Sequence, residues 1–272
     1  MTASNLITRT CTGAAYVAVV LTGIHFQSHC YALSLVAGVC ALIGLAEFYR
    51  MGNRIQDIRI PVWSAACAGM LPYLACALHA CAGWNWVWLL LPLPLAAVYI
   101  TALYDRGAQP VLNLAYLLLG QLLVALPLGS LSYLSTRHDI VWTFALFVLI
   151  WTNDTGAYLT GSLLGRHKLF ERVSPKKSWE GSVGGAVFTL VAGLLFWRFS
   201  GIGGAAQWTG LSLLTVVAGT YGDLLESLLK RSAGVKDSGK ILPGHGGILD
   251  RFDSILLAAP VALAYLEIIR PL

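Results

Sequence analysis

Residues 31–49, YALSLVAGVCALIGLAEFY, form an apolar run that contains one charged residue, Glu47. A helix needs about 20 mostly apolar residues to cross the hydrocarbon core of a bilayer, so this run is typical of a membrane-spanning helix. Eight further apolar runs are bounded by charged or turn-forming residues along the rest of the chain. They cover residues 12–27, 62–81, 84–104, 110–133, 139–161, 179–199, 205–229 and 248–269. The sequence therefore predicts an all-α, polytopic transmembrane helical bundle with about nine spans.

The composition excludes a water-soluble globular protein. Of the 272 residues, 57% are hydrophobic and 11% are charged, whereas about 25% of the residues are charged in an ordinary soluble domain. The net charge of +5 does not indicate a nucleic-acid-binding protein, because no segment is long enough to build a soluble basic face. The six cysteines lack the spacing of a zinc site, and we expect them to be packing residues.

The uneven distribution of basic residues predicts the orientation in the membrane. Loops rich in lysine and arginine tend to stay in the cytoplasm. With the N-terminus placed in the cytoplasm, fifteen of the eighteen basic residues lie on that side. The two most basic loops are residues 162–178 and 230–247. The three basic residues left outside are Arg137, Arg198 and Arg270. The first apolar run follows Arg9 without a convincing cleavage site, so we expect a retained span rather than a signal peptide.

The two halves of the chain differ in their intramembrane charges. Residues 1–140 have few, Glu47 being the exception, and are interpreted as an N-terminal transmembrane scaffold. Residues 141–272 are interpreted as a C-terminal transmembrane catalytic region of the same integral unit. Its acidic residues lie at or just inside the ends of the apolar runs, where an unpaired carboxylate costs at least a few kcal/mol. They are Asp154, Glu180, Asp223, Glu226, Asp250 and Asp253.

Residues 221–231, YGDLLESLLKR, close the eighth predicted span. The spacing of Asp223, Glu226, Ser227 and Lys230 is i, i+3, i+4 and i+7, which predicts one shared helix face. The start of the ninth span similarly predicts Asp250, Asp253 and Ser254 on one face, and the sixth span supplies Asp154. Three helices are therefore expected to carry carboxylates at one level of the membrane.

Carboxylates flanked by basic residues are typical of a site for magnesium and a polyphosphate. Mg²⁺ prefers carboxylate, water and phosphate oxygens, and basic side chains neutralise the remaining phosphate charge. The 234–247 loop is rich in glycine, so its backbone amides can approach phosphate oxygens closely. Lys176 and Lys177 precede the predicted helix start at Trp179, where the helix dipole favours anions.

Simpler interpretations exist for several of these patterns. Gly234 to Lys240 resembles part of a P-loop, but Ile241 stands where serine or threonine is required, and no strand precedes the segment. The G-x-x-x-G pattern of Gly181 and Gly185 is better explained by helix packing. The acidic residues could also form structural ion pairs alone.

The run from Ser227 to Asp253 resembles the C-terminal motif of bacterial phosphatidate cytidylyltransferases, also called CDP-diacylglycerol synthases. The matching positions are Ser227, Lys230-Arg231, Lys236-Asp237, Gly239, Pro243, His245-Gly246-Gly247, Asp250-Arg251 and Asp253. Asp154-Thr155 and the 174–181 segment SPKKSWEG are similar to two further segments of that family. Ser178 replaces the usual threonine and keeps a hydroxyl. The specific resemblance covers about residues 150–254.

The resemblance implies that CTP and phosphatidic acid react to give CDP-diacylglycerol and pyrophosphate in phospholipid synthesis, with Mg²⁺ as cofactor. It implies Asp223, Asp250 and Glu226 as metal ligands. The catalytic residues that it implies are Asp154, Ser227, Lys230, Arg231 and Asp253. Substrate phosphates are expected at Lys176, Lys177, Lys236, Asp237 and His245. The protein is expected to be multi-pass in the bacterial inner membrane, with the active site facing the cytoplasm, no nucleic-acid partner, and a homodimer as one assembly considered.

Two rival functions stay open at this point. A CTP-dependent polyprenol or phytol kinase would use a related membrane scaffold but would transfer the terminal phosphoryl group to an alcohol and release CDP. A secondary transporter would also contain intramembrane carboxylates, but it should place them near the midplane in repeated halves, and this sequence shows no such symmetry.

Overall fold

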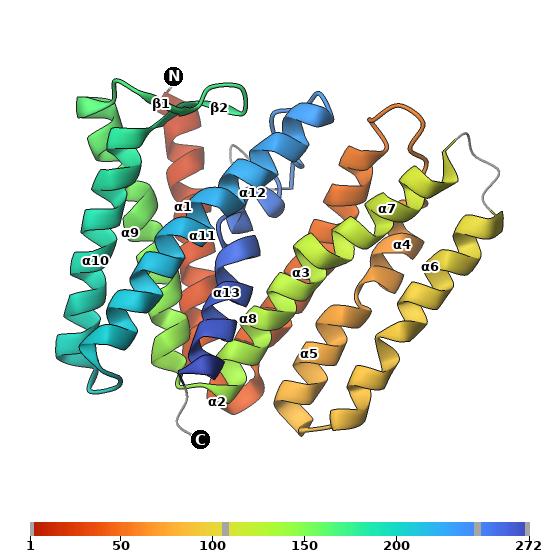
Figure 1. Cartoon of the computed structure of the whole chain (residues 1–272), viewed down its shortest axis with the longest axis horizontal. Coiled ribbons are helices and arrows are strands. Elements are labelled where there is room, and N and C mark those ends of the chain that lie inside the picture. Colours follow the sequence, from red (N-terminus) through yellow and green to blue (C-terminus); the bar gives the residue numbers. More distant parts are fainter. Residues whose placement is uncertain (1–2, 105–108, 242–245, 270–272) are drawn as a thin grey trace. The chain divides into compact units, whose positions relative to one another are not determined.

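The computed structural model describes residues 3–104, 109–241 and 246–269; the side chains of residues 3–9, 90, 94 and 101 are not described. Two predictions therefore lie outside the described residues: the phosphate contact of His245 and the outer position of Arg270. The described chain is mostly helical, with one short pair of strands (Figure 1). The all-α prediction is thus correct except in the 162–178 loop, where the strands form.

The chain divides into two compact units, residues 1–140 with 229–252 and residues 141–228 with 253–272. The division runs through α11, so the chain leaves the second unit at Leu228 and returns to it at Asp253. This division describes how the chain packs and does not test which residues take part in catalysis. The predicted division into scaffold and catalytic regions therefore stays a prediction.

The first unit is built from helices. In chain order they are α1 (Ala3–His25), α2 (Gln27–Cys30), α3 (Ala32–Gly52), α4 (Val62–Gly69), α5 (Leu71–Ala82), the 3₁₀ helix Asn85–Leu90, α6 (Pro92–Tyr104), α7 (Pro110–Gly120), the π-helical segment Gln121–Ala125, α8 (Leu126–Arg137) and α12 (Leu249–Phe252). Helix α3 packs against α8, α4 and α1, and its residues Leu45 and Tyr49 are fully buried. This central position explains how α3 can bury the carboxylate of Glu47, which is 1% exposed.

The second unit contains the remaining helices and both strands. They are α9 (Ile140–Leu164), β1 (Lys168–Phe170), β2 (Ser174–Ser178), α10 (Trp179–Ser200), α11 (Ala205–Ser232) and α13 (Ile255–Ile268). At Gly181 and Gly185 an added Cβ would meet the backbone oxygens of Ala157 and Asn153 at 2.8 Å. Since only glycine permits this approach of α10 to α9, the helix-packing interpretation of this G-x-x-x-G pattern is confirmed.

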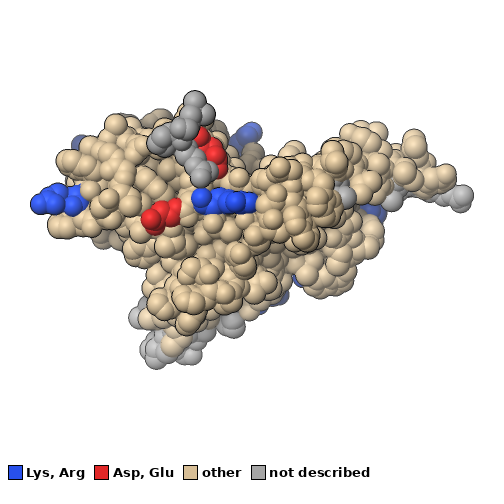
Figure 2. Space-filling model, turned by 90° about the horizontal axis from the view of Figure 1, so that it is seen from below, with Lys and Arg blue, Asp and Glu red and all other residues tan. Residues whose placement is uncertain are grey.

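Five helical segments in the described chain are long and apolar enough to cross a membrane: Ala32–Gly52, Val62–Ala82, Pro110–Arg137, Ile140–Leu164 and Trp179–Ser200. Shorter apolar helices cover Thr10–His25, Leu95–Tyr104 and Ile255–Ile268. Large apolar side chains such as Leu35, Leu103 and Val187 are exposed, as expected for surfaces that contact lipid. On the face shown in Figure 2, charged side chains are few among neutral ones. The helical membrane fold is thus confirmed, whereas the count of nine spans and the cytoplasmic N-terminus stay predictions.

The 162–178 segment was expected to be a loop, but part of it forms an antiparallel hairpin in which β1 pairs with β2. At the end of β2, the Ser178 side chain accepts a hydrogen bond from the Gly181 amide, 3.1 Å away, and caps α10. A serine at this position satisfies an amide that has no partner within the helix. The cap joins β2 directly to α10 and so sets where Lys177 stands.

Candidate active site

The centre of the candidate site in the second unit is a cluster of three carboxylates. Asp223 and Glu226 lie on α11, and Asp253 lies just before α13. One carboxylate oxygen from each residue lies within 4.8 Å of the others, and Glu226 is 2% exposed. Because like charges at this separation repel, a cluster of this kind is stabilised by a cation.

The close approach of α11 to the start of α13 creates this cluster. At Gly222 an added Cβ would meet the backbone oxygen of Asp253 at 2.7 Å and that of Ser254 at 3.2 Å. A residue with a side chain would therefore push the two segments apart. Gly222 directly precedes Asp223 in the chain. The glycine that permits the close approach is therefore next to a carboxylate of the cluster.

The predicted single helix over residues 248–269 is wrong. Helix α12 ends at Phe252 and α13 begins at Ile255, with Asp253 and Ser254 in a turn between them. The Asp253 carboxylate accepts a hydrogen bond of 2.7 Å from the Ser254 amide, a local bond that competes with helix formation. Asp250, Asp253 and Ser254 therefore do not share the face of one continuous helix.

Lys177 brings positive charge to the carboxylate cluster. Its Nζ lies 2.7 Å from Asp223 Oδ2, and both side chains are partly exposed. The Ser227 hydroxyl donates to Asp223 Oδ1 at 3.3 Å, as the predicted i, i+4 spacing on one helix allows. Asp154 on α9 interacts electrostatically with both Asp223 and Lys177. The second unit thus brings together five predicted site residues, namely Asp154, Lys177, Asp223, Glu226 and Asp253, with Ser227 alongside.

Asp250, in the first unit, has different surroundings. Lys230 Nζ lies 2.6 Å from Asp250 Oδ1, with the two side chains 12% and 7% exposed. Asp250 Oδ2 accepts hydrogen bonds from the Gly247 amide at 2.7 Å and from the Ser238 amide and hydroxyl, both at 2.9 Å. Burial alone raises the pKa of this carboxyl, but the bonds from Lys230 and Gly247 hold the pKa below its ordinary value. Asp250 is therefore an ionised carboxylate already compensated by the protein.

Glu47 is the residue that sequence reasoning placed in the scaffold and the structure places beside this loop. Its Oε2 accepts hydrogen bonds from the Ser238 hydroxyl and the Leu249 amide, each at 3.1 Å. An added Cβ at Gly239 or Gly247 would collide with the Glu47 carboxylate. Some glycines of the 234–247 loop thus permit close approach to buried carboxylates of the protein. The sequence signal was the single acidic residue within an otherwise apolar run, because such a residue needs polar partners.

The other predicted residues have fewer contacts. Lys176 is exposed on β2, and Lys236 and Asp237 are exposed after α11. The Arg231 guanidinium donates to the Val235 backbone oxygen at 3.4 Å, where the chain turns after α11. Glu180 binds the His167 ring at 2.6 Å and accepts from the Arg166 and His167 amides. Glu180 therefore stabilises the connection from α9 to β1, which supports a structural role for this acidic residue.

Comparison with known protein families shows to which family the chain belongs. The model of the cytidylyltransferase family matches residues 7–269. The chain belongs to the cytidylyltransferase family. This match includes both units and both carboxylate sites, so the N-terminal half is part of the family as well as the motif-bearing half.

Curated relatives agree with this assignment. A protein of Staphylococcus haemolyticus named phosphatidate cytidylyltransferase is 37% identical over 237 residues, which cover 84% of this chain and 87% of that protein. One of Staphylococcus aureus with the same name is 35% identical over 235 residues, with the same coverage. One of Haemophilus influenzae is 45% identical over 128 residues, 45% of this chain and 44% of that protein. The family resemblance inferred from the motifs is confirmed.

Proposed function

We propose that this protein is a phosphatidate cytidylyltransferase, which transfers CMP from CTP to phosphatidic acid and forms CDP-diacylglycerol and pyrophosphate. The observation that carries the proposal is the similarity over 84% of the chain to relatives with this name. The apolar helices support a lipid substrate, since phosphatidic acid resides in the bilayer.

The reaction needs alignment and charge stabilisation more than it needs a dedicated base. A phosphate oxygen of phosphatidic acid attacks the α-phosphorus of CTP, a P–O bond forms, and the bond to the bridging oxygen breaks as pyrophosphate leaves. Because a phosphate monoester is already anionic near neutral pH, the nucleophile does not have to lose a proton first. Positive side chains and fixed positions of the reactants therefore supply most of the catalysis.

The carboxylate cluster fits the predicted magnesium ion. Its oxygen donors are of the type that Mg²⁺ prefers, and we propose Asp223, Glu226 and Asp253 as the residues that would hold it. When bound, Mg²⁺ would neutralise phosphate charge. Lys177 is close enough to Asp223 to contact a phosphate beside the cluster, and Ser227 orients the Asp223 carboxylate. The predicted ligand role of Asp250 stays a prediction, because its oxygens bind Lys230, Ser238 and Gly247.

A product assay with purified protein, CTP, phosphatidic acid and Mg²⁺ tests the proposal. We expect stoichiometric pyrophosphate and CDP-diacylglycerol. Release of CDP with a polyprenol or phytol acceptor would instead identify the kinase alternative. Absence of CTP turnover in detergent, with uptake of a solute in vesicles, would support the transporter.

The expected location is the bacterial inner membrane with the active site on the cytoplasmic side. Cysteines introduced at Ser174 and Ser232, in a background without the six native cysteines, test it. Both should resist an impermeant thiol reagent in intact cells and react after the cells are opened. Labelling from outside would invert the predicted orientation and place the site away from CTP.

A further inference from the structure

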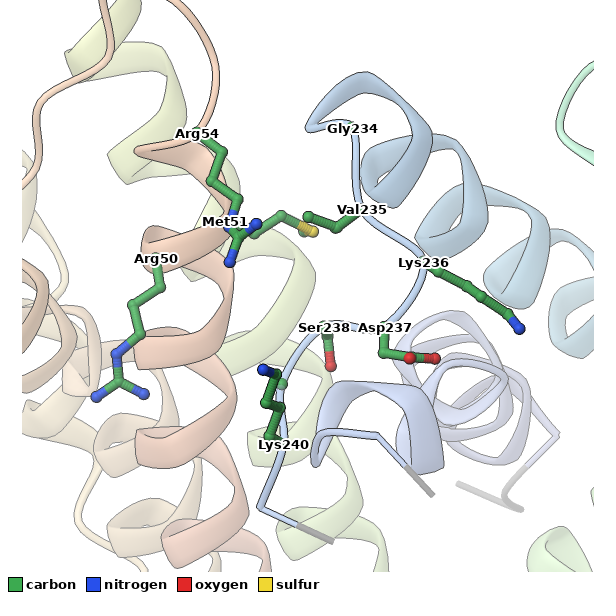
Figure 3. A pocket seen from close by; sticks show the side chains of 10 residues that line it. Arg50, Met51, Arg54, Gly234, Val235, Lys236, Asp237, Ser238 and Lys240 are labelled. Atoms are coloured by element: carbon green, nitrogen blue, oxygen red, sulfur yellow. The ribbon is translucent and has the colours of Figure 1, made fainter. Parts of the chain in front are cut away.

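A pocket of about 610 Å³ lies in the first unit between the C-terminal end of α3 and the 234–240 segment after α11 (Figure 3). Its volume is in the range of small-molecule sites. Four basic residues line it: Arg50 and Arg54 from α3 and the turn that follows it, and Lys236 and Lys240 from the segment. Arg54 comes from the half of the chain that sequence reasoning assigned to the scaffold.

Two of the four cations face each other across the pocket. Figure 3 shows the Arg54 side chain extending toward the 234–240 segment and the end of Lys240 pointing toward it, whereas Lys236 and Asp237 extend to the other side. The Arg50 guanidinium points away, and it lies 4.8 Å from the centre of the Trp63 ring. Arg54 and Lys240 are therefore the side chains placed to contact a ligand in this pocket.

The charge of the pocket indicates an anionic ligand. Among the residues that the structure describes, no carboxylate lies within ion-pair distance of Arg54 or Lys240. Asp237 is the acidic residue of the lining, and it points away from them. Phosphate groups are the anions that arginine binds through two parallel hydrogen bonds and lysine binds as a point charge.

The lining favours a polyphosphate over a lipid headgroup. Two of the lining side chains, Met51 and Val235, are apolar, and the others are those of Arg50, Arg54, Lys236, Asp237, Ser238 and Lys240. Ser238 lines the same pocket and donates two hydrogen bonds to Asp250, the partner of Lys230. One residue of the pocket lining therefore also binds the carboxylate of the Asp250–Lys230 pair.

We propose that this pocket binds the pyrophosphate portion of CTP and the pyrophosphate product, with Arg54 and Lys240 as its cations. The identity of the ligand rests on the proposed cytidylyltransferase reaction, which consumes a triphosphate and releases pyrophosphate. The binding site itself rests on the pocket and its charges.

The test uses the full-length protein in detergent with inorganic pyrophosphate as the probe. We expect Arg54→Gln and Lys240→Gln each to weaken pyrophosphate binding, measured by calorimetry, by about tenfold. The Michaelis constant for CTP should rise by a similar factor, while that for phosphatidic acid changes less than about twofold. Arg54→Lys should recover part of the binding, because it keeps the charge.

Arg59→Gln is the matched control. Arg59 is an exposed arginine of the same unit outside this pocket, and its guanidinium donates to the Ile58 backbone oxygen. If Arg59→Gln weakened pyrophosphate binding as much as Arg54→Gln, the effect would be due to general surface charge, and the proposal would be overturned. Unchanged pyrophosphate binding in folded Arg54→Gln and Lys240→Gln proteins would also overturn it, as would a rise confined to the Michaelis constant for phosphatidic acid.

These measurements distinguish a failure of the proposed binding site from a failure of the proposed reaction. If wild-type protein binds pyrophosphate, and Arg54→Gln weakens that binding without any CDP-diacylglycerol being formed, the site is retained and the proposed function fails. If wild-type protein forms CDP-diacylglycerol and Arg54→Gln binds pyrophosphate normally, the function is retained and the site fails.

Discussion

The carboxylate cluster of the second unit and the Asp250 site of the first unit use the same chemical group in opposite ways. Asp223, Glu226 and Asp253 place three carboxylates within 4.8 Å, with Lys177 as a partly exposed counter-ion. Asp250 is one carboxylate paired with a lysine whose side chain is 12% exposed, and it accepts hydrogen bonds from Gly247 and Ser238.

These different surroundings distinguish the carboxylates that stabilise the fold from those that do not. The carboxylates of a cluster with excess negative charge repel one another until a cation binds. Replacing one of them should therefore lower activity without lowering stability. A carboxylate compensated by buried donors is part of the folded structure, so its removal leaves those donors without a partner. Substitutions at these carboxylates and at their partners test this contrast.

Asp223→Asn should lower kcat/KM by about 100-fold or more, because it removes a carboxylate from the proposed metal site. Its melting temperature in detergent should stay the same or rise, since repulsion within the cluster falls. Initial rates across a Mg²⁺ titration measure the first effect, and Glu171→Gln, on the exposed hairpin turn, is the control. A large loss of stability would contradict the contrast.

Asp250→Asn should also lower activity, but it should lower the melting temperature as well. If Asp223 and Asp250 contribute to one metal site, the double variant should be little less active than either single one. Multiplicative losses with unchanged metal dependence would show instead that the two carboxylates act separately.

Lys230→Ala should lower the free energy of unfolding by about 3–5 kcal/mol, because it leaves the Asp250 carboxylate buried without its counter-ion. Lys230→Arg should retain part of both stability and activity, since the charge persists with altered geometry. Denaturation in detergent measures the change. The double variant Lys230→Ala/Asp250→Asn should recover stability but not activity, and a failure to recover would argue against a direct pair.

Ser238→Ala should lower the free energy of unfolding by about 1 kcal/mol, the usual contribution of one hydrogen bond. The hydroxyl lies between Glu47 and Asp250, and its single proton serves one of them at a time, while the Ser238 amide remains bound to Asp250. Ser232→Ala is the control, because that hydroxyl bonds within its own helix end. Equal effects of the two changes would remove Ser238 from the network.

Lys177→Gln should change the free energy of unfolding least, by less than about 1 kcal/mol, because its ion pair with Asp223 is partly exposed to solvent. Added salt should weaken even this difference. If Lys177→Gln lowered the free energy of unfolding as much as Lys230→Ala, the two ion pairs would be equivalent, although Lys177 is more exposed than Lys230.

Sequence reasoning predicted the local part of the site well. The i, i+4 spacing of Asp223 and Ser227 predicted one face of α11, and the structure confirms it with a hydrogen bond. The break between α12 and α13 was missed because residues 248–269 were taken as one apolar run, although Asp250, Arg251, Asp253 and Ser254 make its start polar. The hairpin of residues 168–178 is short and polar, so no periodicity indicated it.

The helical membrane class, the positions of most helices and the family could be predicted from the amino-acid sequence alone. These properties depend on composition, on apolar runs and on motifs that are contiguous in the chain. The folded structure was needed to show that Asp253 lies beside Asp223 and Glu226, that Lys177 on β2 binds Asp223, and that Glu47 binds Ser238. Those contacts join residues far apart in the chain, and close packing at glycines such as Gly222 and Gly239 brings them within reach of one another.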